Sequence, residues 1–243
     1  MFVYDTVVLR PSQRPIDLNL VWVNSECMRQ HSFVEGNFYH IYTNSIGNMS
    51  LFPAIRDYQR FLLTMFSANG EVSIPRLDRL SGLNLVWDIR DGKIDTGEPL
   101  VKIVNFCLMK THFHCTLGEN RNGNISRFMH KILVSFAKYT NKKHERRGHV
   151  FESNFHSRPL DTNEYFLRTS CYIHLNPKDI KEWRSKEKQY PWSSYQDYVG
   201  KNRWGKLIHP ETVLAQFKGG SDYERFVEEA RPEIFEGDYI HLN

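Results

Sequence analysis

The sequence lacks several features that would each assign it to a special class of protein. No run of apolar residues approaches the ~18 needed to cross a bilayer, so we expect no transmembrane helix and no membrane partner. The first residues show no basic region followed by an apolar stretch, so we expect no secretory signal. No repeat and no low-complexity tract recurs along the chain, which excludes a collagen-like protein.

Cysteine is also scarce. The four cysteines, Cys27, Cys107, Cys115 and Cys171, form no CxxC pair and have no regular spacing. A chain of 243 residues can bury a sizeable core without disulfides. The sequence therefore predicts reduced thiols and a cytoplasmic protein.

What is present is an ordinary globular composition with a mild excess of positive charge. Apolar residues make up 40% of the chain and charged residues 25%, which excludes intrinsic disorder for most of it. The net charge of +4 allows a polyanionic partner without requiring one. Aromatic residues reach 14%, and such rings either fill a core or stack on unpaired bases.

The spacing of apolar residues predicts alternating strands and helices. Strands are expected over 38–43, 100–109, 112–117 and 150–155, and helices over 53–66, 124–142 and 161–175. This β-α-β-β-α-β order indicates an α+β protein with a ferredoxin-like core, one antiparallel sheet and an extra helix that can pack on a sheet face.

The rest of the chain is expected to be less regular. We expect loops with a short hairpin near 83–94, short helices near 191–198, 210–217 and 221–230, and a loosely held tail after Arg231. The chain then divides into an N-terminal extension over 1–36, a catalytic domain over 37–180 with an insertion at 67–99, and a C-terminal helical extension over 181–243.

A His-x-His pair, His112 and His114, begins one of the predicted strands. Residues i and i+2 of a strand share a face, so the two imidazoles lie roughly 7 Å apart along the backbone and can converge on one cation. Two half-buried histidines with ordinary partners would give the same short pattern. A zinc site that adds Cys107 and Cys115 is a further alternative, although Cys115 alternates away from the histidines.

A second candidate group lies at the end of the predicted helix 161–175. Tyr172 and Asn176 are four residues apart and share a helix face, just before Pro177. A phenol and an amide oxygen on one face can address a phosphate and a metal, or they can be a core aromatic and a helix cap. His174 points about 200° away from Tyr172, so we do not expect it in the same site.

Together the two groups favour phosphate chemistry. Two imidazoles and one amide oxygen leave coordination positions open and suit Mg²⁺ or Mn²⁺, which polarise phosphate oxygens. A tyrosine with a pKa of about 10 needs help to act as a nucleophile at neutral pH, which a metal or basic surroundings can supply.

An ordered series of segments resembles the single-tyrosine transposases of the HUH superfamily, in particular the branch with the REP-associated tyrosine transposases. The series is Phe38-Tyr-His-Ile-Tyr-Thr, Asp57-Tyr-Gln-Arg-Phe-Leu, His112-Phe-His, Gly148-His-Val-Phe-Glu-Ser-Asn-Phe, Ser157-Arg-Pro, Tyr172-Ile-His-Leu-Asn-Pro and Trp192-Ser-Ser-Tyr-Gln-Asp-Tyr-Val-Gly. The chain departs from the family at Lys110-Thr111 and at Lys178-Asp179.

The resemblance implies a function and a role for each residue. His112, His114 and Asn176 match the metal ligands, and Tyr172 matches the nucleophile. The implied enzyme is a transposase that cuts single-stranded DNA near hairpins through a 5′-phosphotyrosine, leaves a free 3′-OH and later rejoins strands without ATP. The resemblance leaves open whether Tyr172 acts in its own subunit or in a homodimer.

Two other functions are compatible with the same residues: a domesticated protein that binds DNA or RNA hairpins without cutting, and a nickase of the replication-initiator or relaxase type. Basic residues are candidates for contacts to the DNA backbone, or they simply face solvent and the helix dipole. They are Lys142, Lys143, Arg146, Arg147 and Arg158.

Overall fold

The structure is a computed structural model that describes residues 32–74 and 83–236, so Cys27 and most of the expected N-terminal extension lie outside the described residues. It is an α+β fold built on one antiparallel sheet with the strand order β2-β3-β1-β4. The strands are β1 (Phe38–Asn44), β2 (Val101–Leu108), β3 (His112–Glu119) and β4 (His156–Pro159).

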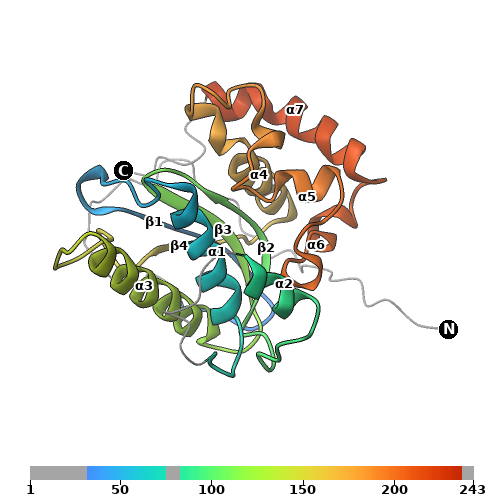
Figure 1. Ribbon diagram of the computed structural model, residues 1–243. Helices are drawn as coiled ribbons and strands as arrows, with labels where there is room; N and C mark the ends of the chain where they lie inside the picture. Colours follow the sequence, from blue (N-terminus) through green and yellow to red (C-terminus); the bar gives the residue numbers. More distant parts are fainter. Residues whose placement is uncertain (1–31, 75–82, 237–243) are drawn as a thin grey trace.

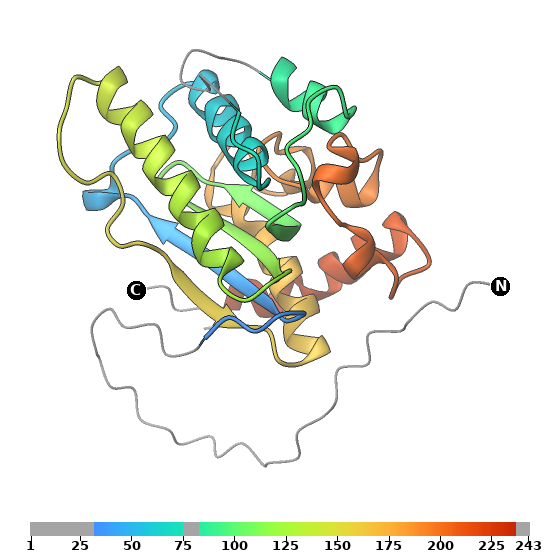
Figure 2. The same ribbon diagram turned by 90° about the horizontal axis from the view of Figure 1, so that it is seen from below.

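Helices cover both faces of this sheet (Figures 1 and 2). They are α1 (Ile55–Ala68), α2 (Asn84–Arg90), α3 (Asn124–Lys143), α4 (Asn163–Leu175), α5 (Tyr195–Val199), α6 (Glu211–Leu214) and α7 (Gly220–Glu236), with a 3₁₀ turn, η3 (Asn176–Asp179), directly after α4. No helix within the described ranges is both long and apolar enough to span a bilayer.

The two faces of the sheet differ in polarity because side chains alternate along each strand. The face under α1 and α3 is apolar: Ile41, Phe113 and Leu117 pack there in the main core. Phe61 of α1 bridges the two layers, with ring centroids 4.7 Å from Phe113 and 5.1 Å from Phe136 of α3. The opposite face, under α4, carries the histidines of β1 and β3 next to a second apolar cluster that includes Val104 and Phe166. The histidines therefore lie on the α4 side of the sheet, away from the main core.

Three expectations from the sequence are wrong. Residues 84–90 form the helix α2 rather than part of a hairpin, because Val86 and Ile89, three residues apart, are both buried. The last strand of the sheet is 156–159, not 150–155. The earlier segment fills the core with Val150, Phe151 and Phe155, and within it only Phe151 makes an isolated bridge, to Ser45.

The third correction concerns the tail. The chain after Arg231 continues as α7 to Glu236 instead of loosening, and residues 237–243 of the expected tail lie outside the described residues. Arg231 holds this part down because its guanidinium lies 3.1 Å from a carboxylate oxygen of Glu187 and 2.6 Å from one of Glu228.

Buried polar contacts hold α4 against its neighbours. The Asn105 amide on β2 donates to the Ser170 hydroxyl at 3.0 Å, and Ser170 lies 2.7 Å from the Tyr223 hydroxyl of α7. His174 places one ring nitrogen 2.7 Å from the Tyr223 hydroxyl and the other 3.0 Å from the Ser194 hydroxyl. As expected, His174 thus lies apart from His112 and His114. Helix α4 is anchored to the sheet, to α7 and to the segment before α5 at once.

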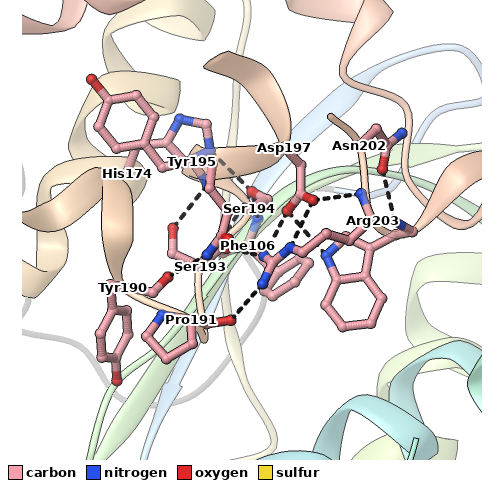
Figure 3. Close-up of polar contacts among 12 residues, drawn as sticks. Phe106, His174, Tyr190, Pro191, Ser193, Ser194, Tyr195, Asp197, Asn202 and Arg203 are labelled. Carbon is pink, nitrogen blue, oxygen red and sulfur yellow. Dashed lines mark hydrogen bonds and ion pairs between the residues drawn. The ribbon is translucent and has the colours of Figure 1, made fainter. Parts of the chain in front are cut away.

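The segment from Pro191 to Trp204 is organised around Asp197 (Figure 3). The buried Asp197 carboxylate accepts hydrogen bonds from the backbone and guanidinium of Arg203 at 2.8–2.9 Å and from the Trp204 indole at 3.1 Å. Arg203 also donates to the carbonyl oxygens of Pro191 and Ser193. One ion pair therefore closes this segment into a compact unit beside β2.

We predict that Asp197→Asn lowers the free energy of unfolding by about 3 kcal/mol, since it leaves the partly buried Arg203 guanidinium without its counter-charge. Urea denaturation measures the change. Asp88→Asn breaks an exposed ion pair with Lys93 and serves as the control, with an expected loss below about 1 kcal/mol. Equal losses in the two variants would contradict the structural role of Asp197.

His174 makes stability depend on pH. Burial lowers its pKa from 6.5 to about 3, so the folded protein keeps this imidazole neutral while the unfolded chain protonates below pH 6.5. The stability that His174 contributes is fully present above pH 6.5 and is lost as the pH falls toward 3, by up to about 1.4 kcal/mol per pH unit. Between pH 7 and 5, the free energy of unfolding obtained from denaturation curves should fall less with pH in His174→Gln than in the wild type. The exposed-residue variant His144→Gln should behave like the wild type.

Candidate active site

The two histidines of the His-x-His pair lie on the polar face of β3, under the end of α4. Their ring centroids are 5.1 Å apart. His112 points its Nε2 atom at the Oδ1 atom of Asn176, 3.3 Å away, and its Nδ1 atom lies 3.1 Å from the Thr111 hydroxyl. The predicted neighbourhood of His112, His114 and Asn176 is therefore present in the fold.

Tyr172 and Asn176 reach this face from above. Thr162 caps α4 by accepting a hydrogen bond from the Tyr165 backbone at 3.1 Å, one residue later than the expected start at Asp161. At the other end the helix passes into η3, which contains Asn176. The Tyr172 ring stands edge-on to the His114 ring, with centroids 5.4 Å apart, and the Asn176 amide lies 3.4 Å from the Tyr172 carbonyl oxygen.

A third histidine, His40 of β1, belongs to the same cluster and was not identified from the sequence. Its Nε2 atom lies 3.0 Å from Nδ1 of His114, and its side chain is fully buried. The β1 and β3 register pairs Tyr42 with His114, which puts His40 diagonally across from His114 on the same face. The alternation within 38–43 indicated the face, but only the register shows which residue of β3 it meets.

Burial determines the protonation states at the site. Desolvation lowers the pKa of His40 to about 3 and also lowers the pKa values of His112 and His114, so all three imidazoles are neutral at pH 7. Desolvation raises the pKa of Tyr172 to about 12, while its hydrogen bond with Asn176 acts in the opposite direction and the nearby Asp179 carboxylate raises it further. The resting tyrosine is a neutral phenol.

The donor atoms fit a divalent cation that prefers nitrogen and oxygen ligands. Among the described residues, Nε2 of His114 is buried without a hydrogen-bonding partner, which is a costly arrangement unless something else binds there. Neutral imidazoles are the form that coordinates metals. No group of three or more His, Cys, Asp and Glu side chains in the described ranges is arranged to hold a metal ion by itself, so a metal here would use His112, His114 and the Asn176 amide oxygen.

The cysteines do not complete a zinc site with these histidines. Cys115 lies on the opposite face of β3, in the apolar core. Cys107 packs in a separate apolar cluster with Met109 and Ile173. Burial raises the pKa of both thiols, so neither is a ready thiolate ligand.

The basic candidates fall into two groups. Arg158 of β4 stands opposite His40 in the register, and its charge lowers the pKa of His40, a smaller effect than burial, so it lies beside the site. The other four lie in the last turn of α3 and in the loop that follows it. Of these, Lys143 is held 2.5 Å from the buried Asp57 carboxylate, and Arg146 donates to the His149 carbonyl oxygen at 2.8 Å. The remaining two, Lys142 and Arg147, are exposed.

Comparison with known proteins gives an independent view of this region. Residues 97–176, which span the His-x-His pair through Asn176, match the family model described as "Transposase IS200 like". No curated protein matches the chain. A solved REP-associated tyrosine transposase, described as bound to a REP hairpin, is 15% identical to the chain and superimposes with a TM-score of 0.52 over 76% of this chain and 92% of that one.

At this identity the solved structure supports the fold alone, whereas the family match covers His112, His114, Tyr172 and Asn176 themselves. The resemblance stated from the sequence is thereby confirmed. The chain carries an IS200-like transposase domain, on a fold that matches a REP-associated tyrosine transposase.

Proposed function

We propose that this protein is a metal-dependent single-stranded DNA endonuclease and strand transferase that cuts near DNA hairpins through Tyr172. The observation that carries the proposal is the meeting of Tyr172, Asn176, His112 and His114 at one point of one chain. The two histidines lie on β3, whereas Tyr172 and Asn176 lie on α4 and η3, with α3 and β4 between them in the chain. A protein that only binds DNA has no need of these residues together.

Each residue has a distinct part in the proposed reaction. His112, His114 and Asn176 would hold Mg²⁺ or Mn²⁺, which when bound polarises the scissile phosphate. The Tyr172 oxygen attacks phosphorus, the bond to the 3′ oxygen breaks, and the proton lost by the phenol is balanced by one gained at the 3′-OH. The product is a 5′-phosphotyrosine, and attack by a 3′-OH in reverse rejoins strands. Because one phosphoester replaces another, the reaction needs no ATP.

The neutral state of Tyr172 links its activation to metal binding. A phenol whose pKa is about 12 is a poor nucleophile at pH 7. Burial causes most of this rise in the pKa of Tyr172. A divalent cation bound near the ring would lower the pKa again, because its positive charge stabilises the phenolate. Tyr172 would then react only when the cation and the scissile phosphate are both in place. DNA bound in another position would not be cut.

The anchoring of α4 favours reaction within one subunit. The helix is bound through Ser170 and His174 to β2, α7 and the segment before α5, so Tyr172 stays beside the histidines of its own chain. We therefore infer that Tyr172 acts in cis.

We also propose the domain organisation expected from the sequence. A ferredoxin-like core lies within a catalytic domain over 37–180, which is flanked by extensions over 1–36 and 181–243.

The covalent adduct provides the decisive test. With Mg²⁺ or Mn²⁺ and single-stranded hairpin DNA from the flanks of its own gene, the wild type should give a shifted band on a denaturing gel. Tyr172→Phe should abolish the band while hairpin affinity stays within about twofold, since only the nucleophile is lost. His112→Ala should abolish it through loss of a metal ligand. Tyr165→Phe, a tyrosine on the same helix, should leave it intact.

The outcomes separate the competing functions. A band that persists in Tyr172→Phe would show that another residue is the nucleophile. A wild type that binds the hairpin and never forms an adduct would favour the non-catalytic hairpin-binding protein. Nicked DNA with an adduct but no rejoined strands would favour a nickase of the initiator or relaxase type.

We propose that the DNA backbone lies along Arg158, the last turn of α3 and the loop that follows it. Lys142→Gln and Arg147→Gln should each weaken hairpin binding and reduce the salt dependence of log Kd by about one unit, because each removes one phosphate contact. Fluorescence anisotropy across a salt series measures both. Lys143→Gln is the matched control: it breaks the pair with Asp57 and should lower stability more than it changes the salt slope.

A further inference from the structure

His40 and His114 form a hydrogen-bonded pair of buried imidazoles. The two ring nitrogens that take no part in this hydrogen bond restrict how the pair can be protonated. The bond joins Nε2 of His40 to Nδ1 of His114 at 3.0 Å. Both rings are at most 1% exposed. Among the described residues, the two remaining nitrogens, Nδ1 of His40 and Nε2 of His114, are buried without partners.

Two neutral imidazoles can share this bond in only two ways. In one, His40 donates from Nε2, and His114 must then carry its own proton on Nε2, the atom that faces the proposed cation. In the other, His114 donates from Nδ1, and its Nε2 atom offers a lone pair. Only the second arrangement allows His114 to coordinate a metal.

We propose that His40 is a positioning residue that accepts the Nδ1 proton of His114 and so fixes the tautomer and ring orientation in which His114 binds the metal. This inference rests on the proposed function, since it concerns a ligand of the same cation. Ligating histidines commonly donate their second ring nitrogen to a carboxylate, a carbonyl or water. Here a neutral imidazole takes that place.

The surroundings of His40 suit an acceptor that stays uncharged. Its side chain is fully buried, and its Nε2 atom lies within hydrogen-bonding distance of Nδ1 of His114. Its ring lies against Tyr42, with centroids 5.2 Å apart, and 6.1 Å from the Tyr172 ring. These contacts fix the ring plane and hence the direction in which His114 is held.

The test compares the Mn²⁺ affinity of four folded proteins by calorimetry at pH 7.5. His40→Leu offers no acceptor and should weaken Mn²⁺ binding about ten- to a hundredfold. His40→Gln places an amide oxygen near the former Nε2 atom and should restore binding to within about threefold of the wild type. His156→Leu is the control: His156 stacks on Tyr42 on the same face, but its Nε2 atom lies against Ser153, and its loss should leave the affinity unchanged.

The results distinguish this inference from the proposed function. Equal affinity of His40→Leu and the wild type, or a Gln variant as weak as the Leu variant, would overturn the role of His40 and leave the function standing. A wild type without Mn²⁺ affinity would overturn both. If His40→Leu does not fold, ¹⁵N spectra of the metal-free wild type decide: a proton on Nδ1 of His114 supports the proposal, and a proton on Nε2 overturns it.

Discussion

The site depends on holding one helix against one face of the sheet. The residues with the proposed chemistry sit on two supports, the strand β3 and the end of α4, which are joined along the chain only through α3 and β4. The bonds from Ser170 and His174 to Asn105, Tyr223 and Ser194 keep these supports together. All of these hydrogen bonds are buried. Water therefore cannot replace a partner that is lost, and the remaining polar group stays desolvated without a hydrogen bond.

The sheet itself divides the tasks. Its apolar face packs against α1 and α3 and supplies much of the hydrophobic free energy of folding. This allows the opposite face to carry a cluster of histidines, which is unfavourable for stability because buried imidazoles lose hydration. The stability gained on one side of each strand thus offsets the cost of burying imidazoles on the other side, one residue away in sequence.

Much of this could be predicted from the sequence, and the limits have physical causes. Strong periodicity located α1 and α3, and a capping pattern at the start together with Pro177 at the end located α4. The His-x-His spacing correctly placed His112 and His114 on one face. Residues 84–90 and 150–155 were misassigned because short apolar runs suit a strand, a helix or an irregular core segment equally well. The roles of Lys143, in its pair with Asp57, and of His40 depend on contacts between distant segments, which no local pattern encodes.

The segment around Asp197 has a consequence for assembly. Edge strands invite pairing with other chains because their outward N–H and C=O groups are unpaired. On β2 these groups are already engaged: Phe106 bonds with the Ser194 backbone and hydroxyl, the Leu108 amide bonds with the Trp192 carbonyl, and further donors come from Tyr198 and His209. The chain thus seals its own longer edge and leaves the four-residue β4 as the other border. Self-association by strand addition at β2 would first require the Asp197 unit to detach.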